Sequence, residues 1–209
     1  MRSLMLLSIG LSVTVSLVPG CSEPIDLTEN RGDNVSSLDY PAGPYGYVES
    51  SVIENYKVLG KHPVAGDYAS QPLGNLFLDF YHDDPGANLV LIEGSANWCY
   101  YCNEEAPTIE KIAVDNYDKG VRVVTVLAEG LTQGVPSTEE DLARWVKKHK
   151  FKQQSMAIDP ELRLFQFADS SAFPLHIVLD TKTMQIKWLC VGGEGGCDTK
   201  GAIEELVSQ

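Results

Sequence analysis

The chain has 209 residues, 44% of them hydrophobic, which is enough to bury one core, and a formal net charge of -13. This acidic balance argues against binding to nucleic acid or electrostatic docking on anionic lipid, because both require clusters of lysine and arginine. After the N-terminal segment there is no run of 18 or more apolar residues, so no membrane-spanning helix is predicted there.

The first twenty residues have the layout of a signal peptide. Arg2 supplies a positive charge, Leu4 to Val18 is mostly apolar, and a small residue precedes Cys21. The stretch Val18-Pro19-Gly20-Cys21 resembles a bacterial lipobox, in which cleavage before the cysteine leaves that residue lipid-modified. We therefore predict a lipoprotein-type signal peptide over 1–20 with lipid attachment at Cys21; an ordinary signal peptide with a chance cysteine is the alternative.

The next segment is polar and contains glycine, proline and serine, which is typical of a flexible linker. We predict a tether over 21–45 and a folded domain over 46–209. The expected location is therefore outside the cytoplasm, in the bacterial cell envelope. The lipid anchor would hold the chain to a membrane, with the domain facing the periplasm or the exterior.

Hydrophobic patterning and turn residues predict the elements of the domain. Ser137-Thr138-Glu139-Glu140 has the pattern of a capping box and opens one of the helices, and Gly120 is a natural stop for the helix before it. The strands are expected at Val52–Leu59, Leu76–Tyr81, Leu89–Glu93, Val121–Leu127, Ala157–Asp159, Leu175–Leu179 and Gln185–Cys190, and the helical segments at Asn103–Lys119, Ser137–Lys150, Glu161–Phe167 and Ala202–Val207.

Two connections define the expected sheet. A helix joins the strands Leu89–Glu93 and Val121–Leu127, which is typical of a parallel βαβ unit. The link between Leu175–Leu179 and Gln185–Cys190 is too short for a crossover helix, so those two strands should form an antiparallel hairpin. The pattern predicts a mixed α/β fold.

Trp98-Cys99-Tyr100-Tyr101-Cys102 lies between a predicted strand and a predicted helix. A cysteine at the N-terminal end of a helix faces free backbone N–H groups and the positive end of the helix dipole, which both favour the thiolate. The thiolate is the form that attacks a disulfide. The motif therefore points to thiol–disulfide chemistry, with a static disulfide and half of a zinc site as alternatives.

Two further cysteines, Cys190 and Cys197, flank a glycine-rich stretch that allows a tight return of the chain. A local structural disulfide is the favoured interpretation, and a second redox pair that relays electrons is the alternative. Their spacing is wider than that of a usual zinc knuckle, and the four histidines show no paired ligand spacing, so no metal site is predicted.

Four features together resemble the thioredoxin-like superfamily, in its branch of exported redoxins. Trp98 precedes the first cysteine, Pro107 follows Cys102 by five residues, Glu93 precedes Cys99 by six, and Phe173-Pro174 stands just before a strand. The resemblance extends from about Ser50 to the C-terminus. It implies a thioredoxin-like fold, an α/β architecture with a mixed central sheet and helices on both faces.

The resemblance also implies roles for these residues. Cys99 would be the nucleophile, more exposed than Cys102, and Cys102 would resolve the mixed disulfide. Glu93, if it is buried rather than at a sheet edge, would act as general base for Cys102. Pro174 would follow a cis peptide bond and expose the Phe173 backbone to substrate. Trp98 would pack beside the disulfide and shield it.

The expected activity is that of an exported thiol–disulfide oxidoreductase acting on disulfides of cell-envelope proteins. Its partners would be protein thiol or disulfide substrates and a redox partner protein, and it would need no cofactor beyond the Cys99–Cys102 disulfide. Tyr100-Tyr101 replaces the Gly-Pro of thioredoxin, so the direction of electron transfer stays open. The alternatives are a peroxide-reducing redoxin and a copper-delivering module without catalysis.

Overall fold

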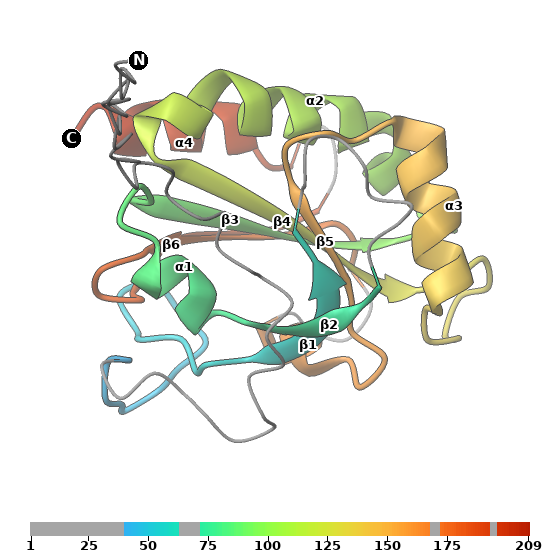
Figure 1. Ribbon diagram of the computed structural model, residues 1–209, viewed down its shortest axis with the longest axis horizontal. Coiled ribbons are helices and arrows are strands. Elements are labelled where there is room, and N and C mark those ends of the chain that lie inside the picture. Colours follow the sequence, from blue (N-terminus) through green and yellow to red (C-terminus); the bar gives the residue numbers. More distant parts are fainter. Residues whose placement is uncertain (1–39, 63–71, 168–171, 193–195) are drawn as a thin grey trace, which may run out of the picture.

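The computed structural model describes residues 40–62, 72–167, 172–192 and 196–209 (Figure 1). The predicted signal peptide, the predicted lipid attachment residue Cys21 and residues 21–39 of the predicted tether lie outside the described residues. Within the described part, no helix has the length and apolar character needed to cross a membrane.

Seven strands and four α-helices make up the described chain, together with two short 3₁₀ helices at Tyr117–Lys119 and Arg163–Phe167. In chain order the strands and α-helices are β1 (Lys57–Lys61), β2 (Gly74–Phe77), α1 (Asp79–Asp83), β3 (Leu89–Ala96), α2 (Tyr100–Asn116), β4 (Val121–Glu129), α3 (Glu139–His149), β5 (Ser155–Ile158), β6 (Leu175–Asp180), β7 (Ile186–Val191) and α4 (Thr199–Val207).

All seven strands form one sheet in the order β2-β1-β5-β4-β3-β6-β7. The strands β3, β4 and β5 are parallel, and every other neighbouring pair is antiparallel. The predicted parallel βαβ unit and the predicted hairpin of β6 and β7 are both confirmed. In Figure 1, α2 and α4 lie along one face of the sheet and α1 lies on the other, so helices cover both faces as expected.

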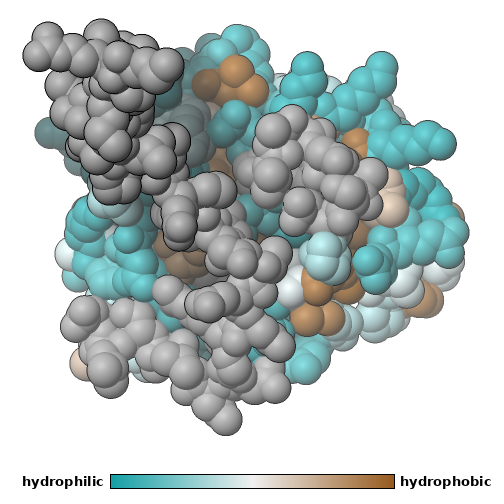
Figure 2. Space-filling model, viewed as in Figure 1, coloured by the Kyte–Doolittle hydropathy of each residue, from teal (hydrophilic) through white to brown (hydrophobic). Residues whose placement is uncertain are grey.

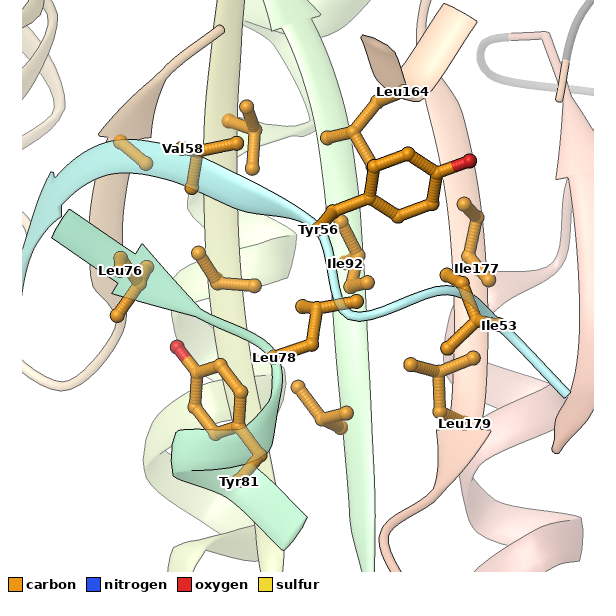
Figure 3. Packing of buried hydrophobic residues seen from close by; sticks show 14 of the residues in the cluster. Ile53, Tyr56, Val58, Leu76, Leu78, Tyr81, Ile92, Leu164, Ile177 and Leu179 are labelled. Carbon is orange, nitrogen blue, oxygen red and sulfur yellow. The ribbon is translucent and has the colours of Figure 1, made fainter. Parts of the chain in front are cut away.

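Alternation along β3 divides its side chains between the two faces. Val90 and Ile92 belong to a core that also contains Tyr81 of α1 and Leu164 of the second 3₁₀ helix, and Figure 3 shows this packing. Leu89 and Leu91 pack on the other face, against Ile109 and Ile112 of α2 and Ile203 of α4. Glu93 alternates with Ile92 and therefore lies on the α2 side.

A third buried cluster contains both cysteines of the motif. Cys99, Cys102 and Ala106 pack there with residues of α3 and β5, among them Leu142, Trp145 and Met156. The hydrophilic side chains of α3 cover the outside, at the right of Figure 2. The first turns of α2 therefore pack into a buried cluster.

The expectation of a strand over Leu76–Tyr81 was wrong at its C-terminal half. The strand β2 ends at Phe77, and Tyr81 lies in α1, where its side chain is 1% exposed. The backbone N–H of Tyr81 donates to the carbonyl of Leu78, so a helical turn replaces the strand. An apolar run of this length fits a buried strand and a buried turn equally well.

Several boundaries also differ from expectation. Val52 makes only isolated bridges, to Tyr45 and to Gln185, and β1 begins at Lys57. The helix α3 is capped one residue later than predicted, because the Thr138 hydroxyl accepts from the Asp141 N–H and the Asp141 carboxylate accepts from the Thr138 N–H. Ser137 instead donates its hydroxyl to the carbonyl of Leu127 in the interior.

Candidate active site

A disulfide joins Cys99 and Cys102 at the start of α2, with their Cα atoms 5.3 Å apart. Cys99 is the N-cap residue of the helix, and its Sγ accepts the backbone N–H of Cys102 at 3.1 Å. The helix begins at Tyr100, earlier than the predicted Asn103, because the motif itself forms the first turn. The backbone N–H of Cys102 in this turn faces the Cys99 sulfur and favours its thiolate once the disulfide is reduced.

Both sulfurs are enclosed. Cys99 is 3% exposed and Cys102 is fully buried, so the N-terminal cysteine is the more accessible of the two, as predicted, but by a small margin. Trp98 and Phe173 belong to the same buried cluster as the two cysteines. The two aromatic side chains therefore pack in the surroundings of the disulfide.

Asn103 holds the turn from inside α2. Its Nδ2 donates to the carbonyl oxygens of Asn97 at 3.1 Å and of Cys99 at 2.7 Å. Its Oδ1 accepts from Nζ of Lys148 at 2.5 Å and lies 3.2 Å from Nε2 of His149. The last turn of α3 is thus tied to the cysteine motif, a role that no spacing in the sequence indicated.

Trp98 has a fixed orientation next to the disulfide. Its Nε1–H donates to Oε2 of Glu129 at 2.6 Å, and its ring meets that of Phe173 edge to face with centroids 5.7 Å apart. Oε2 of Glu129 also accepts the backbone N–H of Gly134 at 2.8 Å. Sequence reasoning missed Glu129, which lies 31 residues from Trp98 in the chain.

The peptide bond between Phe173 and Pro174 is cis. Pro174 lies directly before β6, and its carbonyl oxygen accepts the N–H of Gly192 at 2.9 Å. Phe173 is 9% exposed and contacts Trp98, so the structure brings the cis-proline segment and the cysteine motif together.

Glu93 lies in the interior and not at a sheet edge. It is fully buried in the central strand β3, opposite Thr125 of β4 and His176 of β6. Its Oε1 is 2.5 Å from the hydroxyl of Ser95, and its Oε2 is 2.5 Å from that of Thr125. Burial, and next the charge of Glu105, raise the pKa of Glu93 above its ordinary value.

His176 is a buried strand residue with a partner on α2. Its Nε2 lies 2.7 Å from Oε1 of Glu105, which comes three residues after Cys102. The pair connects β6 to the helix that carries the disulfide. The other ring nitrogen of His176, Nδ1, is buried without a hydrogen-bond partner among the described residues.

Cys190 and Cys197 form a second disulfide, with Cα atoms 5.9 Å apart. It closes the segment between β7 and α4, and Cys190 is paired in register with His176. Cys197 also lines a shallow cleft between the starts of α2 and α4, together with Glu104 and Glu105. This disulfide therefore ties the segment directly before α4 to β7.

The two residues between Cys99 and Cys102 project into solvent. Tyr100 is 68% exposed and Tyr101 is 51% exposed, and their rings contact each other with centroids 5.4 Å apart. Among the described residues, no group of three or more histidine, cysteine or acidic side chains is arranged to hold a metal ion.

No protein-family model and no curated protein sequence matches this chain. Solved structures do resemble it. A thiol:disulfide interchange protein from a Bacteroides species is 18% identical, with a TM-score of 0.55 over 78% of this chain and 91% of that one. The exposed lipoprotein thioredoxin of Streptococcus pneumoniae is 22% identical, with a TM-score of 0.53 over 74% and 98% of the two chains.

The likeness extends to a peroxiredoxin. The reduced 2-Cys peroxiredoxin of Plasmodium vivax is 15% identical, with a TM-score of 0.58 over 78% of this chain and 95% of that one. Identities this low carry information about architecture alone. Together with the sheet order and the position of the cysteine motif at the start of α2, these likenesses show that the chain has the thioredoxin-like fold.

Proposed function

We propose that the protein is an exported thiol–disulfide oxidoreductase whose working group is the Cys99–Cys102 disulfide. The observation that carries the proposal is the placement of this disulfide at the N-cap of α2, with the buried carboxyl group of Glu93 on the face of the sheet that α2 covers. The named relatives in fold, an interchange protein and a lipoprotein thioredoxin, support it.

In the direction of reduction, the Cys99 thiolate attacks one sulfur of a substrate disulfide. A mixed disulfide forms and the other substrate sulfur leaves as a thiolate. Glu93 takes the proton of the Cys102 thiol, and the Cys102 thiolate attacks Sγ of Cys99. The Cys99–Cys102 disulfide closes, the second substrate thiolate leaves, and two electrons have passed from the protein to the substrate. The reverse sequence would oxidise a substrate dithiol.

The surrounding residues have supporting parts in this proposal. Asn103 holds the carbonyl of Cys99, and Trp98 and Phe173 shield the disulfide from solvent. The cis peptide bond at Pro174 presents the Phe173 backbone to an extended substrate segment. The substrates are protein thiols and disulfides of the cell envelope, and a partner protein restores the redox state.

Export and anchoring belong to the same proposal. The sequence of residues 1–21 supports a lipoprotein signal with lipid at Cys21, and the lipoprotein thioredoxin of S. pneumoniae has a similar fold. Replacing Cys21 by serine should release the protein from membranes into the soluble fraction. A variant that stays membrane-bound would contradict the lipid anchor without touching the redox proposal.

Trapping tests the redox activity directly. In Cys102→Ala the mixed disulfide cannot be resolved, so substrates should stay linked through Cys99 and be identified by mass spectrometry. The matched variant Cys99→Ala should trap none. If Cys102→Ala traps nothing over a range of redox conditions, the proposal is wrong.

Peroxide reduction is the second candidate, because the P. vivax peroxiredoxin shares the fold. It predicts that the reduced protein consumes hydrogen peroxide. The peroxide would oxidise Cys99 to a sulfenic acid, and the thiol of Cys102 would then condense with it to give the disulfide and water. Peroxide consumption that is fast compared with insulin disulfide reduction would favour this candidate.

A further inference from the structure

The hydroxyl group of Thr125 lies between two acceptors. Its Oγ1 is 2.5 Å from Oε2 of Glu93 and 2.5 Å from Oε1 of Gln154. A hydroxyl group has a single proton to donate, so it cannot donate to both oxygens at once. In one of the two contacts, the proton must therefore come from the partner of Thr125. The amide oxygen of Gln154 carries no proton, so the donor in that contact is the carboxyl group of Glu93.

The orientation of the Gln154 amide is set from the other end. Its Nε2 donates to Oε2 of Glu110 at 3.0 Å, on α2. Oε1 of Glu110 accepts the backbone N–H groups of Lys152 and Gln153, at 2.8 and 3.2 Å. Three donors converge on this side chain, which suits a carboxylate that only accepts. The amide must therefore turn its oxygen towards Thr125.

We infer that Gln154 and Glu110 are positioning residues for Glu93: they orient the Thr125 hydroxyl as an acceptor, so that the carboxyl group of Glu93 keeps its proton in the disulfide form of the protein. The chain runs from Glu93 to Thr125, from Thr125 to Gln154, and from Gln154 to Glu110 at the half-buried face of α2. Ionising Glu93 would draw the Thr125 proton back from Gln154.

The other groups around Glu93 fit a protonated carboxyl. Ser95 donates to its Oε1, which leaves Oε2 to face Thr125. From α2, the charge of Glu105 opposes ionisation of Glu93, whereas His176 on β6 favours it. Glu93 is fully buried, and the loss of water around the carboxylate outweighs the favourable contacts, which raises its pKa.

This inference deepens the proposed function and rests on it for its biological meaning. When Cys102 closes the disulfide, the proton that Glu93 has taken from its thiol stays on the carboxyl group. The hydrogen bonds through Thr125 then keep this proton on Glu93. In the reverse reaction, the Cys102 thiolate is released and takes the proton back. The protonation state of the buried Glu93 would thereby depend on Glu110, which is only half-buried on α2.

The test measures the proton itself, on the oxidised protein without substrate. The C=O stretching band of protonated Glu93 is followed by infrared spectroscopy against pH and assigned by its loss in Glu93→Gln. In Gln154→Met, Thr125 is free to donate to the carboxylate, so Glu93 should ionise at lower pH. The acid dissociation constant should rise at least about tenfold, the effect of one added charge-assisted hydrogen bond. Thr125→Val removes both the acceptor of the protonated carboxyl group and the donor to the carboxylate, and it serves as the background in which the effect of Gln154→Met is tested.

The double variant of Gln154→Met and Thr125→Val distinguishes an effect through the hydrogen bonds from a general loss of packing around Glu93. If Gln154 acts through the Thr125 hydroxyl, adding Gln154→Met to Thr125→Val should produce no further shift. An equal shift in both backgrounds would overturn the inference, as would an unchanged ionisation in Gln154→Met. If Gln154→Met fails to fold, Glu110→Ala provides the same test, because its effect should also vanish in Thr125→Val.

Glu104→Ala controls for charge, since Glu104 is also on α2 and lies outside the chain of hydrogen bonds. It should leave Glu93 nearly unchanged, and a shift as large as that of Glu110→Ala would overturn the role of Glu110. None of these measurements requires thiol–disulfide exchange, so the proton inference and the proposed activity can fail independently.

Discussion

The side chain of Glu129, at the last residue of β4, anchors the indole of Trp98 through a hydrogen bond of 2.6 Å. The same carboxylate oxygen accepts the N–H of Gly134 in the following loop. One acidic residue therefore fixes both the ring beside the Cys99–Cys102 disulfide and a turn of the neighbouring loop.

Replacing Glu129 by alanine should release that ring. We expect a loss of about 1–3 kcal/mol in the free energy of unfolding, because two donors lose a shared charged acceptor. Dithiothreitol should also reduce the Cys99–Cys102 disulfide faster, since the Trp98 shield loosens. Glu129→Gln keeps an acceptor oxygen and should lie close to the parent protein in both measurements; equal reduction rates in all three proteins would contradict the anchoring role.

Glu93→Gln should gain stability relative to the parent protein as the pH rises. Above about pH 4.5 the unfolded chain has released the Glu93 proton, whereas the folded protein keeps it because burial raises the pKa. The folded state then binds more protons than the unfolded state, so the free energy of unfolding falls with increasing pH until the folded pKa is passed. Glutamine keeps a hydrogen-bonding group there and does not titrate.

Urea unfolding of the oxidised proteins at pH 4.5 and pH 8 measures this difference. The gap in stability between the variant and the parent should widen towards pH 8. Ser95→Ala serves as a control, because it removes a neighbouring hydrogen bond without removing the titrating group. A gap that stays constant with pH would show that Glu93 ionises normally in the folded protein.

Acid should destabilise the protein through His62. This ring stacks on Phe80 with centroids 3.7 Å apart, and its Nδ1 lies 3.0 Å from the hydroxyl of Ser155. Burial lowers the pKa of His62 to about 4, from 6.5. The unfolded chain therefore binds a proton that the folded protein does not, and stability falls as the pH drops from 6.5 to 4.

His62→Asn keeps a polar atom near the Nδ1 position and cannot take up the proton. Between pH 6.5 and pH 4, its free energy of unfolding should fall less than that of the parent protein, by a difference on the order of 2 kcal/mol. Part of the fall should remain, because burial and then the charge of Lys148 lower the pKa of His149 to about 4 as well. Parallel pH profiles for the two proteins would argue against His62.

The second disulfide distinguishes two interpretations of Cys190 and Cys197. If it is structural, replacing both cysteines by serine should lower the free energy of unfolding by about 2–3 kcal/mol, as expected for a short closed loop. The rate of exchange at Cys99–Cys102 should not change. A variant that keeps its stability and loses turnover with a partner protein would instead indicate a relay of electrons through this pair.

Local patterns in the sequence predicted much of this fold. The β-branched runs of β3, β4 and β6 and the apolar stripe of α2 report burial directly, and the short link between β6 and β7 allows only an antiparallel pair. Trp98, Cys99, Cys102 and Phe173 were expected near one another from the resemblance, and the structure places them in one cluster.

The contacts that complete the site come from residues far apart in the chain. Glu129 reaches Trp98, and Gln154 reaches Thr125, across 31 and 29 residues. A single glutamate or glutamine carries no local signal of such a partner, because long polar side chains are common on any surface. The strand expected over Leu76–Tyr81 failed for a related reason, since its apolar run is as suitable for a buried turn.

Tyr100 and Tyr101 occupy the two positions between the sulfurs, and both rings stand largely in water. Neither is part of the cores that hold the sheet and its helices together. A substitution at either tyrosine would change the surface next to Cys99 and leave the three buried clusters of the scaffold intact.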